Sequence, residues 1–323
     1  MKSRYSLLND GKLNRFSFKP LIFGIVVGII FSHVFLLEDE NDARMSIYEG
    51  INRRHDEMEN GFINVTLRCI IVIQPSTLKA EKFITSIRDT YSKSCDEALF
   101  FTSDKKLESQ FANDINIYHF EGNLDQRWYS TVHKIFTFVE KDKPVKNNTW
   151  TVLLNEQNYL VAENLVKFLT KLPSEKSVIC GNLIDVTPFM NYIFPVQTEL
   201  FQIDAGLVLS AQAIREVNTN EVCSPSNWNM PSYTGKALFK CAQMLQFELW
   251  DPVDDEEKRL FLAKSPRDLF AQSNIASQEK SYNDAQRSSP GCCSDQAIIF
   301  GSVNYRDQRV LDYALKRVKV FGL

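Results

Sequence analysis

The fold is decided by residues 150–165, which read WTVLLNEQNYLVAENL. The mostly apolar run Trp150–Leu154, interrupted only by Thr151, predicts a buried strand. A second apolar run, Tyr159–Val161, leads into a helix that we expect to begin near Ala162. A buried strand followed by a turn and a helix is typical of α/β proteins, so this stretch predicts the centre of an α/β sheet.

Three polar residues interrupt the stretch, Asn155, Glu156 and Gln157. They stand at the carboxyl end of the predicted strand, where open α/β sheets usually bind their ligands. A divalent cation that holds a diphosphate prefers several charged oxygen ligands. The triplet offers one carboxylate and two neutral amides, so the sequence predicts a ligand site here and gives it little charge.

The segments around this stretch alternate between short apolar runs and helical periodicity. We expect further strands at Cys69–Ile73, Ala98–Phe101, Ile115–Phe120, Val178–Leu183, Leu207–Ser210 and Ala297–Phe300. We expect helices at Ala80–Tyr91, Trp128–Val139, Leu165–Leu172, Ala211–Val217, Gly235–Leu249 and Arg306–Val318. Strands separated by helices predict a mostly parallel, Rossmann-like sheet flanked by helices. No Gly-x-Gly-x-x-Gly or Walker sequence follows a strand, which excludes the usual dinucleotide and P-loop sites.

Two segments of the second half carry neither pattern. Asp251–Glu257 is a charge run, which we interpret as a solvated face, and Ser265–Pro290 is polar and predicts a loop-rich region. No internal repeat is visible along the chain. Residues 61–323 therefore predict a single folded domain.

The composition excludes several classes of function. Of the 323 residues, 44% are hydrophobic, which is enough for a large core. The net charge of −3 gives no reason to expect a nucleic-acid partner, which favours a basic face. The four histidines have no His-x-x-x-His or His-Glu-x-x-His spacing, so a histidine-rich metal site is not expected.

The N-terminus predicts a membrane anchor. Residues 1–20 carry five lysines and arginines and one acid, and the apolar run Leu21–Leu37 is followed directly by a cluster of acids. Positive charge before an apolar run orients it with its N-terminus in the cytosol. We therefore predict a cytosolic tail at 1–20, a transmembrane signal anchor at 21–37 and a lumenal stem at 38–60 of a single-pass type II protein. A cleaved signal peptide is the alternative.

The cysteines and glycosylation sequons indicate the same compartment. Seven cysteines occur without a Cys-x-x-Cys pair, namely Cys69, Cys95, Cys180, Cys223, Cys241, Cys292 and Cys293. Behind an anchor they indicate disulfides of an oxidising lumen, with at least one thiol free or paired between chains. Buried free thiols of a cytosolic protein are the alternative. With sequons at Asn64 and Asn147, the pattern favours the endoplasmic reticulum or Golgi membrane.

Five blocks of the sequence, in order, resemble the core 1 β1,3-galactosyltransferase family, which includes enzymes and a dedicated chaperone. The blocks are Cys69–Ile73, Cys95–Ser103, Trp150–Leu165, Gly206–Ser210 and Pro290–Asp295. The last block, Pro-Gly-Cys-Cys-Ser-Asp near the C-terminus, is the most specific. The resemblance covers nearly all of 65–323 and implies a GT-A glycosyltransferase fold, a Golgi or endoplasmic reticulum lumen and a role in O-glycan synthesis.

The resemblance also implies where a metal site would lie. Enzymes of the family transfer galactose from UDP-galactose to N-acetylgalactosamine on Ser or Thr, and they bind manganese through an Asp-Asp-Asp triplet. That triplet aligns with Asn155, Glu156 and Gln157. The last aspartate is the direct metal ligand, and Gln157 is neutral and a poorer ligand. Glu156 remains a weak candidate, although its longer side chain would shift the ion.

Other positions of this sequence also lack side chains that the enzymes of the family use for catalysis. The resemblance implies a histidine suited to the metal where this chain has Gly301, and an acidic pair that supplies a general base where it has Thr234 and Gly235. None of these residues has the titratable group that a general base requires. A Gly-Gly near the substrate is replaced by Ile203-Asp204. Loss of the ligands and loss of the base would each lower the rate by orders of magnitude.

The family's disulfide plan can be carried over to this chain. It pairs Cys69 with Cys95 and Cys223 with Cys241, and it leaves Cys292 and Cys293 as an adjacent-residue disulfide or as reactive thiols. Cys180 is left over. We interpret Cys180 as a buried thiol in a strand rather than as a redox group.

These observations predict a catalytically inactive galactosyltransferase-like chaperone, without a cofactor, whose client is a core 1 β1,3-galactosyltransferase. It could form homo- or hetero-oligomers. The alternative is an active β1,3-galactosyltransferase that uses UDP-galactose, with Mn²⁺ or without it, through Glu156, Asp204 and Asp295. Asp295 also has a structural interpretation, as a cap of backbone amides after a tight turn. A lumenal lectin-like or structural protein is a third possibility.

Overall fold

The computed structural model describes residues 65–74, 76–122, 124–144, 148–173, 175–186, 198–276 and 293–317. All of them belong to one unit, Asn60–Leu323. The predicted tail at 1–20, anchor at 21–37 and stem at 38–60 lie outside the described residues, as do Asn64, Asn147 and Cys292. Within the described ranges, no helix combines the length and the hydropathy that crossing a membrane requires.

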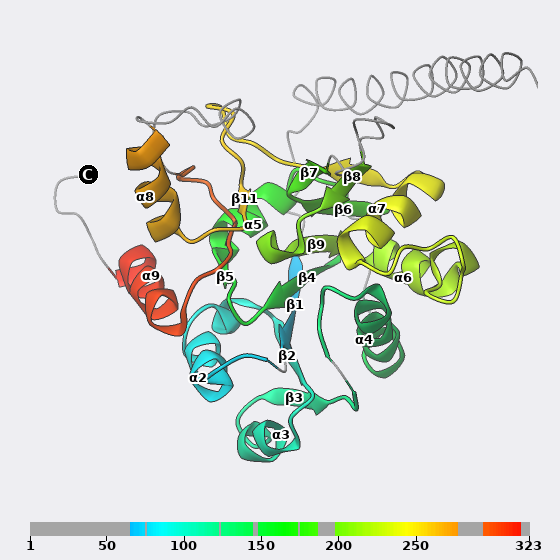
Figure 1. Cartoon of the computed structure of the whole chain (residues 1–323), viewed down its shortest axis with the longest axis horizontal. Helices are drawn as coiled ribbons and strands as arrows, with labels where there is room; N and C mark the ends of the chain where they lie inside the picture. Colours follow the sequence, from blue (N-terminus) through cyan, green and yellow to red (C-terminus); the bar gives the residue numbers. More distant parts are fainter. Residues whose placement is uncertain are drawn as a thin grey trace, which may run out of the picture. The chain divides into compact units, whose positions relative to one another are not determined.

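A sheet of seven strands forms the centre of the domain (Figure 1). Its strands are, in spatial order, β10 (Glu248–Trp250), β6 (Val178–Gly181), β9 (Leu207–Ser210), β4 (Thr149–Asn155), β1 (Thr66–Ile73), β2 (Glu97–Thr102) and β3 (Asn116–His119). Strand β9 runs antiparallel to β4 and β6, and the other neighbouring pairs are parallel. The prediction of a mostly parallel α/β sheet is confirmed.

Strand β4 lies in the middle of this sheet, and each of its residues is buried. The strand order reverses between β1 and β4, because β2 and β3 extend the sheet on one side of β1 and β4 begins the other side. Such a reversal opens a crevice at the carboxyl ends of the strands. Val72 of β1 pairs with Asn155 of β4, so the loop after β1 and the turn after β4 start at the same level.

Helices cover both faces of the sheet. They are α2 (Ala80–Asp89), α3 (Lys105–Phe111), α4 (Tyr129–Asp142), α5 (Ala162–Leu169), α6 (Ala211–Thr219), α7 (Thr234–Met244), α8 (Pro266–Ala276) and α9 (Tyr305–Arg317). Figure 1 shows α4, α6 and α7 on one side of the sheet and α2, α5 and α9 on the other. Alternate residues of β1 enter separate cores, because successive side chains of a strand point to opposite faces. Ile71 shares a core with Ile84 of α2, and Ile70 shares one with Phe136 of α4.

Two small sheets and three short 3₁₀ helices complete the described part. One sheet joins β11 (Phe261–Leu262), β12 (Ile299–Phe300) and β5 (Tyr159–Leu160), and the other is the antiparallel pair β7 (Leu183–Val186) and β8 (Thr198–Phe201). The 3₁₀ helices are η1 (Tyr91–Ser94), η3 (Ile203–Ala205) and η4 (Glu221–Cys223). Pairing of β12 with β5 brings the C-terminal segment next to the turn after β4.

Two of the expected elements extend beyond the observed ones into residues of a separate strand. The expected helix Gly235–Leu249 stops at Met244, and the chain turns into strand β10. Gln246 makes this turn with φ 55°, a left-handed conformation that a continuing helix does not allow. The expected strand Val178–Leu183 is divided at Asn182, because β7 after it joins a different sheet from β6.

The expected loop at Ser265–Pro290 is wrong for its first part, which forms α8. Ser265 starts this helix: its Oγ accepts a hydrogen bond from the N–H of Asp268 (3.2 Å) and donates one to the carboxylate of the same residue (2.7 Å). Ser-Pro-Arg-Asp is a capping sequence with proline at the first helical position. That signal was present in the sequence. Helix α3, which was not expected, has a similar start, with Oδ1 of Asp104 accepting from the N–H of Lys106 (2.9 Å).

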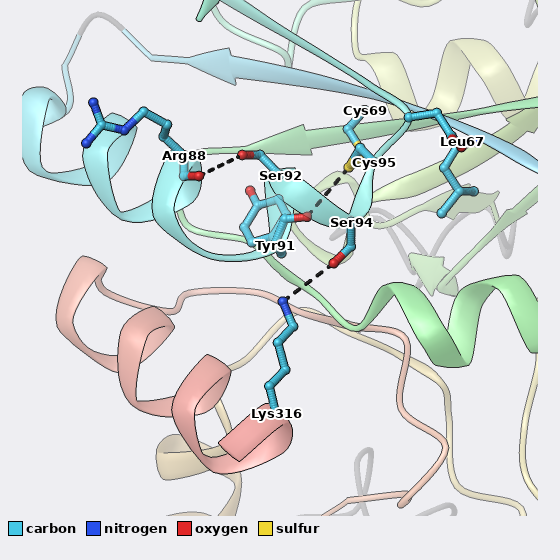
Figure 2. Close-up of a disulfide and its surroundings, with 9 residues drawn as sticks. Leu67, Cys69, Arg88, Tyr91, Ser92, Ser94, Cys95 and Lys316 are labelled. Atoms are coloured by element: carbon cyan, nitrogen blue, oxygen red, sulfur yellow. Dashed lines mark hydrogen bonds between the residues drawn. A yellow bond between two sulfur atoms is a disulfide. The ribbon is translucent and has the colours of Figure 1, made fainter. Parts of the chain in front are cut away.

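Two disulfides join neighbouring elements. Cys69 of β1 is bonded to Cys95, just before β2, and Cys223 of η4 is bonded to Cys241 of α7. These are the two pairs that the resemblance implies. Figure 2 shows the first disulfide between β1 and the segment after α2, where Nζ of Lys316 from α9 also donates to Oγ of Ser94 (3.5 Å).

Two further cysteines have different states. Cys293 is disulfide-bonded. Cys180 is a free thiol that is fully buried in β6. Burial raises the pKa of the Cys180 thiol, and the charge of Glu248 raises it further, so little of the reactive thiolate forms.

Candidate functional site

Asparagine side chains build the turn after β4. Oδ1 of Asn155 accepts a hydrogen bond from the N–H of Gln157 (2.8 Å), and Oδ1 of Asn158 accepts one from the N–H of Asn155 (2.7 Å). Asparagine favours such turns because its short side chain reaches backbone groups two or three residues away. Nδ2 of Asn158 donates to the carbonyl of Asp204 (2.8 Å) and ties the turn to η3. The side chain of Asn155 is thus used in shaping the turn.

Glu156 supplies the carboxylate of the triplet, and only 1% of its surface is exposed. Its oxygens accept hydrogen bonds from the N–H of Gln74 (3.2 Å) and from the hydroxyl of Thr77. Both donors lie in the loop between β1 and α2, so the carboxylate joins the two strand ends at the crevice. Burial raises the pKa of Glu156; the two hydrogen bonds oppose the rise, and the negative charge of Asp125 adds to it.

The third residue of the triplet, Gln157, is exposed. Its backbone carbonyl accepts a hydrogen bond from the N–H of Val303 (2.8 Å). Nε2 of Gln308, a buried residue of α9, donates to the carbonyls of Glu156 (2.8 Å) and Asn158 (3.0 Å). The C-terminal segment therefore holds the backbone of the triplet, and the side chain of Gln157 takes no part.

Backbone atoms fill the space at the two glycines that replace family side chains. A Cβ at Gly235 would lie 2.0 Å from the carbonyl oxygen of Phe201. A Cβ at Gly301 would lie 2.3 Å from the carbonyl oxygen of Asp204 and 2.6 Å from that of Ala263. Because a backbone carbonyl cannot rotate away as a flexible side chain can, neither position accepts a side chain without a shift of the main chain.

Thr234 precedes the first of these glycines and is fully buried. Its hydroxyl donates to the carbonyl of Gln126 (2.6 Å), and its N–H donates to the carbonyl of Arg127 (2.9 Å). Both contacts fasten the start of α7 to the segment before α4. Thr234 therefore has a structural role and no group that could accept the proton of an acceptor hydroxyl.

Sequence reasoning missed two charged residues at the same edge, Asp125 and Arg127. Asp125 is buried, and its Oδ2 accepts hydrogen bonds from Nε (2.9 Å) and Nη2 (2.6 Å) of Arg127. The signal was available, since both follow the strand end near Phe120, where polar residues gather in α/β folds. Desolvation raises the pKa of Asp204, Arg127 opposes the rise and Asp125 adds to it. Asp125, Arg127, Glu156 and Asp204 therefore form one interacting group of charges.

The structure places Asp295 elsewhere. Its side chain is exposed, in the turn before β12, and lines a surface hollow together with Asp254 and Lys258. The amides of this turn are capped by Ser294, whose Oγ accepts from the N–H of Gln296 (3.0 Å). Asp295 therefore neither joins Glu156 and Asp204 nor provides the cap that the sequence suggested for it.

The residues present do not fit the manganese site that the resemblance implies. The side-chain oxygens of Asn155 and Glu156 accept protein hydrogen bonds, and Gly301 has no ligand to offer. Across the ranges that the structure describes, no group of three or more His, Cys, Asp or Glu side chains is placed to hold a metal ion. No reaction step through a metal follows from this arrangement.

Comparison with known proteins shows a similarity to a galactosyltransferase. No known family model matches the sequence. The chain is similar to glycoprotein-N-acetylgalactosamine 3-beta-galactosyltransferase 1 of Xenopus laevis, with 23% identity over 265 residues, 80% of this chain and 68% of that protein. This similarity supports a galactosyltransferase-like protein and leaves its activity unresolved.

Similar solved structures share only a coarse arrangement with this chain. One is the galactosyltransferase LgtC in complex with donor and acceptor sugar analogs, at 9% identity, 79% of this chain, 98% of that chain and a TM-score of 0.39. Another is 4-diphosphocytidyl-2C-methyl-D-erythritol synthase, at 10% identity, 56% of this chain, 87% of that chain and a TM-score of 0.36. At these values neither likeness bears on activity.

Proposed function

We propose that this chain is a catalytically inactive galactosyltransferase-like chaperone, similar to the core 1 galactosyltransferase-specific chaperone Cosmc. Its client is a core 1 β1,3-galactosyltransferase of mucin-type O-glycan synthesis. We further propose a GT-A-like domain that faces the lumen of the endoplasmic reticulum or Golgi behind a type II membrane anchor. The similarity to a galactosyltransferase supports the family relationship, and the candidate site supports the loss of catalysis.

The observation that carries the proposal is the environment of Glu156. The triplet keeps one carboxylate, and that carboxylate is buried and accepts hydrogen bonds from Gln74 and Thr77. A metal ligand needs free lone pairs directed at the ion, and here both carboxylate oxygens already accept hydrogen bonds from the protein. Burial also raises the pKa of this carboxyl group, which makes it a weaker ligand. The group therefore serves the loop after β1 rather than a cofactor.

The two glycines support the same conclusion by a separate route. Carbonyl oxygens of Phe201, Asp204 and Ala263 occupy the space that side chains at Gly235 and Gly301 would need. The backbone has thus adapted to the loss of the family's base and ligand positions. A galactosyltransferase-like core with its disulfides and a changed site suits protein binding better than sugar transfer.

The alternative is an active galactosyltransferase with a changed site. One observation favours it: the carboxylates of Asp125, Glu156 and Asp204 interact at the edge of the sheet where α/β proteins bind ligands. Arg127 neutralises part of that charge through Asp125. The remaining negative charge would repel a sugar diphosphate unless a cation accompanied it.

A transfer assay separates the two proposals. The purified lumenal domain is incubated with UDP-galactose, manganese and a peptide that carries N-acetylgalactosamine on Ser or Thr. The chaperone proposal predicts no product above a heat-inactivated control. Robust transfer of galactose to the peptide would contradict it. A parallel thermal melt with UDP tests the metal, because only a ligand that binds the native state raises Tm. Addition of manganese to UDP should leave Tm unchanged, and a clear manganese-dependent rise would favour the enzyme.

A further inference from the structure

The first turn of α9 packs against the side of α2, the helix that follows the loop held by Glu156. Oγ of Ser86 in α2 donates to the carbonyl of Tyr305, the first residue of α9 (2.8 Å). The rings of Phe83 and Tyr305 are 5.6 Å apart and nearly perpendicular. These contacts fix the start of α9 against the side of α2.

Two positive side chains, Lys82 and Arg306, lie beside the ring of Tyr305 at this junction, and Lys79 precedes the same helix as Lys82. Nζ of Lys82 lies 5.6 Å from the centre of the Tyr305 ring, and Cζ of Arg306 lies 5.7 Å from it. Burial alone would raise the pKa of Tyr305, but the charges of Arg306, Lys82 and Lys79 outweigh it and lower the pKa. The charges near the phenol hydroxyl are therefore mainly positive. We call Lys79, Lys82, Tyr305 and Arg306 the cation cluster.

The cation cluster differs in its ion pairs from the other positive side chains of α9. Among the described residues, Lys79, Lys82 and Arg306 take part in no ion pair. The other cations of α9 differ: Arg309 pairs with Asp89 (3.3 Å) and Lys316 with Asp312 (2.7 Å).

Two acidic residues, Glu81 and Asp307, are adjacent in sequence to members of the cation cluster. The carboxylate of Asp307 accepts a hydrogen bond from Nδ2 of Asn304 at the start of α9. Glu81 is exposed and is one residue from Lys82, so it projects about 100° away around α2. Lys82 instead lies one turn before Ser86, on the side of α2 that contacts Tyr305. The net charge that faces the junction is positive.

The backbone adds to this charge. Lys79 precedes α2 with φ 66° and ψ 36°, and no side chain caps the first amides of the helix. A residue in the left-handed conformation before a helical turn directs successive N–H groups to one side, and this arrangement favours the binding of an anion. The amides of α9 are different, because Asn304 caps them through the N–H groups of Arg306 and Asp307.

We propose that the cation cluster of Lys79, Lys82, Tyr305 and Arg306 binds a phosphate-class oxyanion without a metal ion. Two ammonium groups and a guanidinium provide charge-assisted hydrogen bonds to several oxygens of one group, which phosphate offers and a single carboxylate does not. This site is separate from the triplet and goes beyond the proposed function. The anion is either a free phosphate or pyrophosphate, or the phosphate part of a nucleotide.

Calorimetric titration of the lumenal domain tests the proposal, with inorganic pyrophosphate in a metal-free, low-salt buffer containing a chelator. The variant Lys82→Gln/Arg306→Gln should bind pyrophosphate at least tenfold more weakly than the unmodified domain. The matched variant Arg309→Gln/Lys316→Gln removes two positive charges from the same region, and its affinity should stay within about twofold. Both pairs are exposed or partly exposed, so the variants should fold, which circular dichroism and Tm check.

Separate arms identify the source of the anion. If UDP binds more tightly than pyrophosphate and uridine alone also binds, the ligand is a nucleotide; equal affinities for UDP and pyrophosphate indicate a free anion. The proposal is overturned if pyrophosphate does not bind, or if both double variants lose affinity equally, which would indicate general attraction to positive charge. A failure here leaves the chaperone proposal intact, because that proposal requires no anion.

Discussion

The carboxylate of Glu156 accepts a hydrogen bond from the hydroxyl of Thr77 and thereby joins the end of β4 to the loop after β1. In the enzymes that the chain resembles, a metal-binding carboxylate would occupy this region. Here the same kind of group is buried and holds a loop. Both oxygens of this carboxylate are therefore engaged in hydrogen bonds with the loop after β1.

Substitution of Glu156 should separate a structural carboxylate from a catalytic one. Glu156→Ala leaves the N–H of Gln74 and the hydroxyl of Thr77 without a partner, which should lower the free energy of unfolding by about 1–3 kcal/mol. Glu156→Gln keeps an acceptor and removes a buried charge, so it should be near neutral at pH 7.5. Urea unfolding measures both. Equal losses in the two variants would contradict the structural role.

Titration of Glu156 should make the stability of the protein depend on pH. Its pKa is raised in the folded protein, so the folded state keeps a proton that the unfolded state has already lost. Its contribution is therefore fully present below the ordinary carboxyl pKa and decreases as the pH rises through the folded value. Glu156→Gln should show a flatter decline than the unmodified domain over that window in urea unfolding at several pH values. Parallel curves would indicate that the residue titrates normally.

Restoring the family's side chains at the glycines should damage the fold. Gly235→Asp places a Cβ against the carbonyl oxygen of Phe201, and Gly301→His places one against that of Asp204. Each should lower the free energy of unfolding by about 3 kcal/mol, as overpacked positions do. Lys236→Asp is the control for the first change, because it adds a carboxylate on an exposed neighbour and should alter stability by less than about 0.5 kcal/mol. If Gly235→Asp is as stable as its control, the carbonyl of Phe201 does not block a side chain at position 235.

The cysteines should differ in reactivity and in their effect on stability. Removing the Cys223–Cys241 disulfide with a Cys223→Ala/Cys241→Ala variant should lower the free energy of unfolding by about 3 kcal/mol. Cys180 should resist alkylation in the native protein and react only after denaturation, because its thiol is buried and its pKa is raised. Peptide mapping by mass spectrometry measures that reactivity. Rapid native alkylation of Cys180 would show that β6 is accessible.

The ion pair between Asp125 and Arg127 should contribute to protein stability mainly because it compensates the buried charge of Asp125. Only 6% of the Asp125 side chain is exposed, against 62% for Arg127. Arg127→Met would leave a buried carboxylate without its partner and should lower stability by about 1–2 kcal/mol, less than for a fully buried pair. Arg127→Lys restores the charge without the two-pronged contact and should recover part of the loss. Thermal melts at matched salt measure both, and an unchanged Tm for Arg127→Met would rule out a role for the pair.

The sequence predicted the sheet well because its strands are buried and apolar. Cys69–Ile73 is a continuous hydrophobic run and Trp150–Leu154 is broken only by Thr151, a pattern typical of strands in a covered sheet. The first run lies within β1 and the second within β4. Helix α8 was missed because polar composition was given more weight than the cap at Ser265. Strand β10 was missed because it has only three residues, too few to show the alternation of polar and apolar side chains that identifies a strand.

The candidate site could be predicted in position but not in detail. The triplet follows β4 as expected, yet a sequence does not show that Glu156 turns toward Thr77 or that Phe201 fills the space beside Gly235. Those contacts join segments far apart along the chain. Asp125 and Arg127 follow a predicted strand end and could have been found from the sequence, but their interaction with Asp204 from another part of the sequence could not.

The chaperone proposal is tested most directly in cells from which the gene has been removed. The measurement is core 1 β1,3-galactosyltransferase activity in lysates, normalised to the transcript of that enzyme. The proposal predicts that activity falls while the transcript persists, and that re-expression of either the unmodified chain or Glu156→Gln restores it. Unaltered galactosyltransferase activity after removal of the gene would contradict the proposal.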